Sequence, residues 1–187
     1  SIIFSSLLSY AIEPFGLDET KRLRKPLVIA AQGVSFTVAM ELMMAGDIRV
    51  ASRTARFAQL EVQRGFFPCG GGTVRLIQEI GWGNAMRYLL TGDEFSGEEA
   101  YRMGFVQQLT EPGEQFEAAL KIARTIATAA PLGVQAALAS SRLARVHGDK
   151  IALEALMPAL PAMMQTADMQ EAIAAFKEKR APVFKGA

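Results

Sequence analysis

The sequence predicts an α/β protein whose mixed body, residues 1–111, is followed by a helical carboxyl-terminal region, residues 112–187. Two observations predict this division. In the first part, short apolar runs bounded by glycine or proline alternate with helical periodicity, which is typical of strands and helices stacked in layers. In the second part, helical periodicity recurs almost without interruption. With 187 residues, half of them hydrophobic, the chain is long enough to bury a substantial core.

The first elements surround an apolar helix. Leu27–Gln32 is a run of β-branched and small apolar residues, which predicts a buried strand. Residues 36–45 are almost wholly apolar, so we expect a helix inside the protein that ends at Gly46. Two more short strands are expected at Ile48–Ala51 and Arg56–Gln59.

A glycine-rich loop, residues 65–73, follows the strands and leads into an amphipathic helix at Val74–Ile80. Ser96–Glu99 has the spacing of a capping box and predicts the start of another helix, with a strand after it at Gly104–Gln108. The helices expected in the second part are Gln115–Ala129, Leu132–Val146, Ile151–Met164 and Asp168–Lys179, the last capped by Asp168.

Charge and composition exclude several classes of function. Lys and Arg number 20 against 19 Asp and Glu, which is no excess of the kind that marks a nucleic-acid binder. No apolar run reaches the roughly 20 residues of a membrane span. The first residues lack the basic lead and cleavage site of a secretion signal.

The single cysteine and the single histidine are not expected to carry chemistry. Cys69 cannot form an internal disulfide, no Cys/His spacing fits a metal site, and a reducing, cytoplasmic compartment fits best. As a nucleophile Cys69 would need a nearby base. His147 lies in a polar, loop-like stretch, where a solvent-facing histidine is the ordinary outcome.

Glu41 is the sharpest anomaly, because it is an ionisable residue in the middle of an apolar helix. Burial without a partner raises the pKa of a carboxyl group toward the range of a general acid or base. The alternative is a structural glutamate that reaches a groove or pairs with Arg49 or Arg53, and the residues themselves leave both interpretations open.

Glu61 follows a predicted strand and precedes the glycine loop, and Arg64 offers it an ordinary ion pair. Two carboxyl groups that converge on one water can divide the roles of base and acid. The loop itself, Cys69–Arg75, lacks the Gly-Lys-Ser/Thr ending of a phosphate-binding loop. Its glycines permit close approach of the backbone, and the helix amino terminus that follows favours negative charge.

Several motifs stand in a specific order and spacing: Lys25–Gly33, Glu41–Ile48, Ala55–Glu61, Gly65–Leu76, Leu90–Asp93, Ala100–Val106 and Phe176–Phe184. In that order they resemble the crotonase, or enoyl-CoA hydratase/isomerase, family over essentially the whole chain. The resemblance implies a crotonase-like core, a spiral of ββα units. It also implies that the family's amino-terminal portion, which supplies a second oxyanion donor, has no counterpart before Ser1.

The implied reaction is addition of water across a 2-enoyl-CoA thioester. In family members of the hydratase type, the positions matching Glu41 and Glu61 hold one water between them. The backbone N–H at the position of Val38 serves the oxyanion hole, and the position of Cys69 touches the water through its backbone. No cofactor is implied, because coenzyme A is part of the substrate.

Alternatives remain within the resemblance. An isomerase would use mainly Glu61, and a non-catalytic module would bind acyl-CoA or only assemble with its own kind. Where the family usually has a run of glycines, this chain has Thr37–Ala39, whose side chains are expected to crowd the thioester. The apolar helical region 112–187 is expected to join copies of the chain into a homotrimer or hexamer, as in the family.

Overall fold

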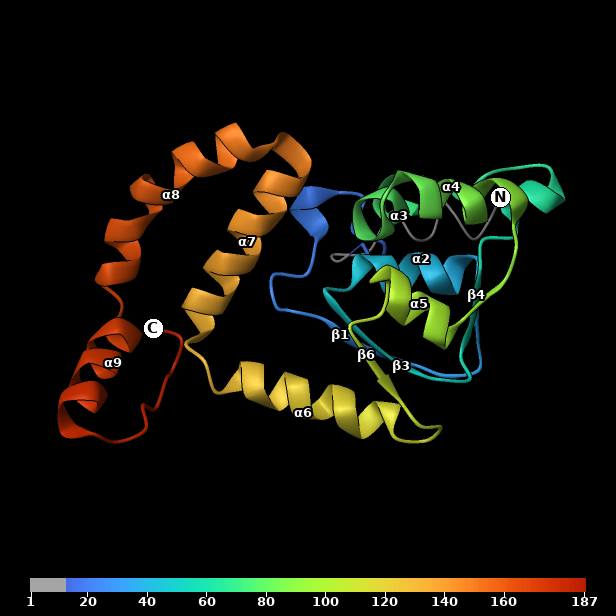
Figure 1. Ribbon diagram of the computed structural model, residues 1–187. Helices are drawn as coiled ribbons and strands as arrows, with labels where there is room; N and C mark the ends of the chain where they lie inside the picture. The colour runs from blue at the N-terminus through green and yellow to red at the C-terminus, as the bar shows by residue number, and fades with distance from the viewer. Residues whose placement is uncertain (1–12) are drawn as a thin grey trace. The chain divides into compact units, whose positions relative to one another are not determined.

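The computed structural model describes residues 13–187 (Figure 1). The predicted features of the first twelve residues therefore lie outside the described part. The described chain forms two compact units. The first holds the residues up to Lys121 apart from Arg24–Pro26, and the second holds Arg24–Pro26 and Ile122–Ala187. The predicted division at residue 111 and the assembly role of residues 112–187 stay predictions.

Two small sheets build the first unit. Strands β1 (Val28–Ala31), β3 (Ile48–Ser52) and β6 (Gln108–Thr110) form a parallel sheet in the order β1-β3-β6. The other sheet contains β2 (Val34–Phe36), β4 (Arg56–Ala58) and β5 (Phe95–Ser96), with β2 parallel and β5 antiparallel to β4. In chain order, β1 and β2 precede α2, and β3 and β4 precede α3, which confirms the ββα arrangement.

The helices of the first unit cover these sheets. Figure 1 shows α2 in the middle of the unit, with α3 and α4 on one side and β1, β3 and β6 on the other. Methionines of α2 and aromatic side chains, including Phe57, Phe95 and Phe105, form the shared core. The helical segments that lie wholly in the first unit are η1 (Glu19–Lys21), α2 (Val38–Ala45), η2 (Glu61–Arg64), α3 (Gly72–Ile80), α4 (Trp82–Thr91) and α5 (Gly97–Met103). Helix α6 (Gln115–Ala127) begins in the first unit and ends in the second.

The second unit is helical, as the periodicity predicts. It contains α7 (Pro131–His147), α8 (Asp149–Met164) and α9 (Ala167–Glu178). Few of its side chains are buried, although α7 and α8 are largely apolar. Among the described helices none is by itself long and apolar enough to cross a membrane. Only α6 and α7 taken together, across a bend of 108°, meet that test of length and composition.

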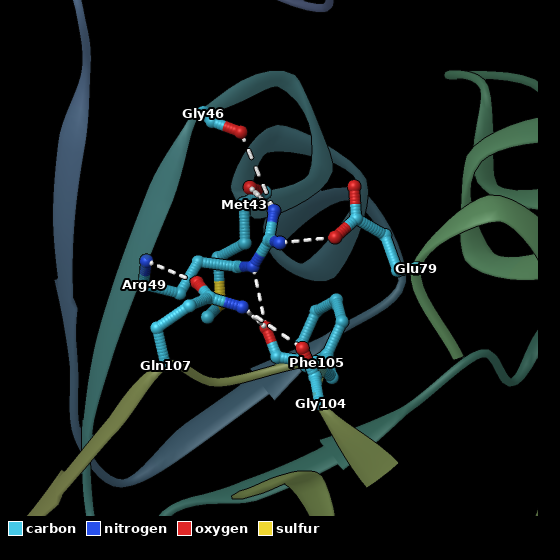
Figure 2. A network of polar contacts seen from close by, with 7 residues as sticks. All are labelled: Met43, Gly46, Arg49, Glu79, Gly104, Phe105 and Gln107. Atoms are coloured by element: carbon cyan, nitrogen blue, oxygen red, sulfur yellow. Dashed lines mark hydrogen bonds and ion pairs between the residues drawn. The ribbon is translucent and has the colours of Figure 1, made fainter. Parts of the chain in front are cut away.

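A buried arginine ties the elements around α2 together (Figure 2). Arg49, on β3, is 2% exposed and donates to the carbonyls of Met43 and Gly46, at the end of α2, at 3.2 and 3.3 Å. It also donates to the Phe105 carbonyl at 2.5 Å and forms an ion pair with Glu79 of α3. One side chain therefore fixes the carboxyl end of α2 to α3.

Three expectations about local structure are wrong. The strand predicted at Gly104–Gln108 begins only at its last residue. Gly104 is the left-handed end of α5, with φ +88°, so residues 104–107 form a turn. Helix α9 is capped by Thr166, which accepts from Met169 N, whereas buried Asp168 accepts from the backbone N–H groups of Lys185 and Gly186. His147 ends α7 and does not lie in a loop.

Candidate active site

Glu41 lies buried in the first turn of α2, 5% exposed, at the point where this helix faces the start of α3. Its Oε1 atom accepts hydrogen bonds from the backbone N–H groups of Gly70 and Gly72, at 2.7 and 2.9 Å. Arg49 and Arg53, its possible partners from the sequence, instead form ion pairs with Glu79 and with Glu98 and Glu111. The glycine loop therefore fixes the orientation of this carboxyl group.

Two glycines of the loop are required by the position of Glu41. A Cβ atom at Gly70 would lie 2.7 Å from Glu41 Oε2, and one at Gly72 would lie 3.1 Å from Glu41 Oε1 and 2.9 Å from Pro68 Cβ. Any side chain at Gly70 would displace the carboxyl group. The sequence predicts that the backbone of the glycine loop closely approaches another group, and in the structure that group is the Glu41 carboxyl group.

Glu61 is the first residue of η2, which follows β4 after Gln59 and Leu60, and is 3% exposed. Burial raises the pKa of this carboxyl group above its ordinary value, and the negative charge of Glu41 adds to the rise. A hydrogen bond from its own backbone and the positive charge of Arg64 oppose the rise without cancelling it. Within residues 13–187 no ion pair joins Glu61 to Arg64, so the simple surface pair allowed by the sequence does not form.

Gln59 is a further polar residue of the site that sequence reasoning missed. It is almost fully buried, and with its amide nitrogen turned toward Glu61 it donates to both carboxyl oxygens, at 2.9 and 3.1 Å. Turned the other way, the amide oxygen can accept a hydrogen bond from the O–H group of a neutral Glu61. Gln59 can therefore partner either protonation state. A polar residue at the end of a buried strand was the available signal.

The two acids belong to one buried polar cluster. A Cβ atom added at Gly72 would lie 3.1 Å from Glu41 Oε1 and 3.2 Å from the Gln59 amide, and that amide also contacts the Glu61 carboxyl group. The negative charge of Glu41 also raises the pKa of Glu61. The structure thus brings the two glutamates singled out in the sequence into one polar cluster, and their roles as acid and base stay a prediction.

Val38 begins α2, three residues before Glu41, and is half exposed. The residue before it, Thr37, has φ +50° and ψ −117°, a backbone conformation that favours glycine, and its side chain does not cap the helix. N–H groups in the first helical turn have no partner within the helix and carry the positive end of its dipole. The Val38 N–H is therefore suited to a developing negative charge.

Cys69 is exposed at the edge of the site. Its thiol donates to the Phe67 carbonyl at 3.1 Å, and its backbone immediately precedes the Gly70 N–H that binds Glu41. The role of its backbone toward a water stays a prediction. Within residues 13–187 no three His, Cys, Asp or Glu side chains are grouped so that they could share a metal ion.

Comparison with known proteins finds one matching family and similar relatives. The family described as enoyl-CoA hydratase/isomerase matches residues 15–187. The chain is 34% identical over 165 residues to an enoyl-CoA hydratase of Mycobacterium tuberculosis, covering 88% of this chain and 62% of that protein. It is 37% identical over 170 residues to (E)-benzylidenesuccinyl-CoA hydratase of Thauera aromatica, covering 89% of this chain and 65% of that protein.

A solved structure is similar over nearly all of the described fold. The crystal structure of a probable enoyl-CoA hydratase/isomerase from Mycobacterium abscessus is 41% identical, with a TM-score of 0.92. The match covers 99% of this chain and 74% of that one. The chain thus spans less than two thirds of the length of the two curated relatives named above.

Proposed function

The chain belongs to the enoyl-CoA hydratase/isomerase family, and we propose that it adds water across 2-enoyl-CoA thioesters. One observation carries the proposal: two buried glutamates, Glu41 and Glu61, share one polar cluster but have unlike surroundings. An isomerase needs a single acid-base group, whereas hydration needs one group for the water and one for the carbon.

The surroundings of the two acids suggest how the roles divide. Glu41 Oε1 is held by two backbone N–H groups, which orient the carboxylate as a base toward a water. The raised pKa of Glu61 favours its protonated form, so it is the better donor to the α-carbon. The water loses a proton to Glu41, its oxygen bonds to the β-carbon, and Glu61 delivers a proton to the α-carbon.

The negative charge that develops on the thioester oxygen needs a donor. We assign this role to the Val38 N–H at the start of α2, where one such hydrogen bond is worth about 3 kcal/mol in the transition state. The backbone of Cys69 is assigned to the water. The reaction requires no cofactor, since the thioester of coenzyme A is itself the activated group.

Substrate profiling tests the proposal. The purified chain is given crotonyl-CoA, and hydration is followed by loss of the conjugated thioester absorbance; in parallel it is given 3-hexenoyl-CoA, and formation of the conjugated isomer is followed. We expect hydration to be the faster reaction. Faster isomerisation than hydration would contradict the proposal and favour an isomerase that uses mainly Glu61.

A further inference from the structure

A short segment before β1 is folded against the candidate site. Glu13 Oε1 accepts from Phe15 N at 2.8 Å, its other oxygen accepts from Leu17 N, and its carbonyl accepts from Gly16 N at 3.1 Å. Gly16 has φ +61°, which permits the tight turn. Residues 13–17 are therefore a defined turn, and we name them the Phe15 turn.

An arginine of α3 holds the Phe15 turn in place. Arg75, 7% exposed, donates to the carbonyls of Phe15 and Gly16, the latter at 2.7 Å. Arg22 donates to the same Gly16 carbonyl at 2.8 Å. A buried guanidinium that binds two consecutive carbonyls fixes both the position and the direction of the chain between them.

The consequence is that the Phe15 ring lies on the glycine that binds Glu41. A Cβ atom at Gly70 would lie 2.9 Å from Phe15 Cδ1 and 2.7 Å from Glu41 Oε2. Ring edge and carboxyl oxygen are thus close neighbours on the same face of Gly70. The ring is half-buried, so part of its apolar surface remains exposed.

We propose that Phe15 determines acyl specificity: its ring occupies the space beside Glu41 and selects short acyl groups over long ones. The inference rests on the proposed function, because it assumes that the substrate's β-carbon lies at Glu41. A group that extends beyond that carbon meets the ring, which Arg75 prevents from moving aside. Arg75 is then a positioning residue that acts through Phe15.

The test compares the kcat/KM values for crotonyl-CoA and trans-2-decenoyl-CoA in the full chain and its variants. Phe15→Ala should raise the decenoyl-to-crotonyl ratio by about tenfold, a change of the size that pocket contacts confer. Phe15→Leu keeps most of the bulk and should change the ratio little. Arg75→Lys, which cannot hold two carbonyls with one planar fork, should shift the ratio in the same direction as Phe15→Ala.

The control is Phe116→Ala, at an exposed position on α6, which should leave the ratio unchanged. A purely structural role of Phe15 would lower both kcat/KM values equally, and an unchanged ratio in Phe15→Ala would overturn the inference while hydration by the wild type still stands. If the wild type hydrates neither thioester, the proposed function fails and the inference fails with it.

Discussion

At the scale of single residues, the protonation of Glu61 links the site to stability. Because its pKa is raised on folding, the folded chain keeps this proton to a higher pH than the unfolded chain does. The stability this gives is fully present below the unfolded pKa, near 4.5. It is lost as the pH rises through the folded pKa.

We therefore expect Glu61→Gln, which does not titrate, to gain stability relative to the wild type as the pH rises from 4 to 7. Urea unfolding at several pH values measures the difference. Glu94→Gln is the matched control of opposite sign, because Arg56 lowers the pKa of Glu94 and the wild type gains from its ionisation. A difference for Glu61→Gln that does not change with pH would contradict the raised pKa.

Gly70 is a second residue whose substitution is informative. A methyl group there would press on the Glu41 carboxyl group and on the Phe15 ring, so Gly70→Ala should lower the free energy of unfolding by about 1–3 kcal/mol. It should also suppress hydration. Gly83→Ala, in α4 with open space around the added carbon, should instead be neutral or stabilising by up to about 1 kcal/mol. Equal effects of the two substitutions would contradict the described packing.

At the scale of elements, the position of α2 decides where Glu41 lies. The glycine loop holds the helix near Glu41, and Arg49 holds its end to Glu79 of α3. Removing only one member of a buried pair leaves an uncompensated charge. We expect Arg49→Met to cost about 3–5 kcal/mol of stability, with part of the loss restored by adding Glu79→Leu.

Arg56→Met is the control for this pair, since Arg56 forms an ion pair with Glu94 that is exposed to solvent and should contribute much less to stability. Denaturant unfolding of the wild type and the three variants gives all the values. If Arg49→Met lowered the free energy of unfolding no more than Arg56→Met, Arg49 would not hold the end of α2 to α3.

Local patterns predicted most elements but not their pairing. The apolar run of α2, the capping box of α5 and the helices of the second unit follow from periodicity and end signals. Strands β2 and β5, which are very short, and helix α4 carry no comparable signal and were missed. The apolar, buried residues Phe105 and Val106 predict a strand, but they belong to the segment between α5 and β6.

The same limit applies to the site. The anomaly of Glu41 could be seen in the sequence, but its partners Gly70 and Gly72 lie on another element, and only the fold brings them to it. Phe15 gave no local anomaly, since its contact with Gly70 is likewise distant in sequence. The contact of Gln59 with Glu61 is local, but burial of both side chains is decided by the fold. The sequence predicts that the Thr37 side chain crowds the thioester, but its neighbours in sequence do not predict its positive φ angle.

At the scale of the whole molecule, the second unit leaves large apolar side chains in contact with solvent. Leu153, Met157 and Phe176 are 65%, 71% and 86% exposed, and helical faces of this kind mark contacts between proteins. Their burial against further copies of the same chain would satisfy the expected homotrimer or hexamer.

Light scattering after gel filtration tests assembly. We expect a mass of three or six times the 20.2 kDa chain, reduced toward the monomer by Leu153→Glu combined with Met157→Glu. Glu154→Gln, on the same helix, should leave the mass unchanged. A monodisperse wild type at 20.2 kDa would contradict the assembly.

Glu41 and Glu61 are proposed to act as a pair on one water. Hydration of crotonyl-CoA by Glu41→Gln, Glu61→Gln and the double variant shows whether both acids are needed. Each single substitution should lower kcat by about 10²–10⁴-fold in a folded protein, and the double variant should be little worse than either. Glu94→Gln, an exposed site, serves as the control. Turnover like that of the wild type in either single variant would contradict the paired mechanism.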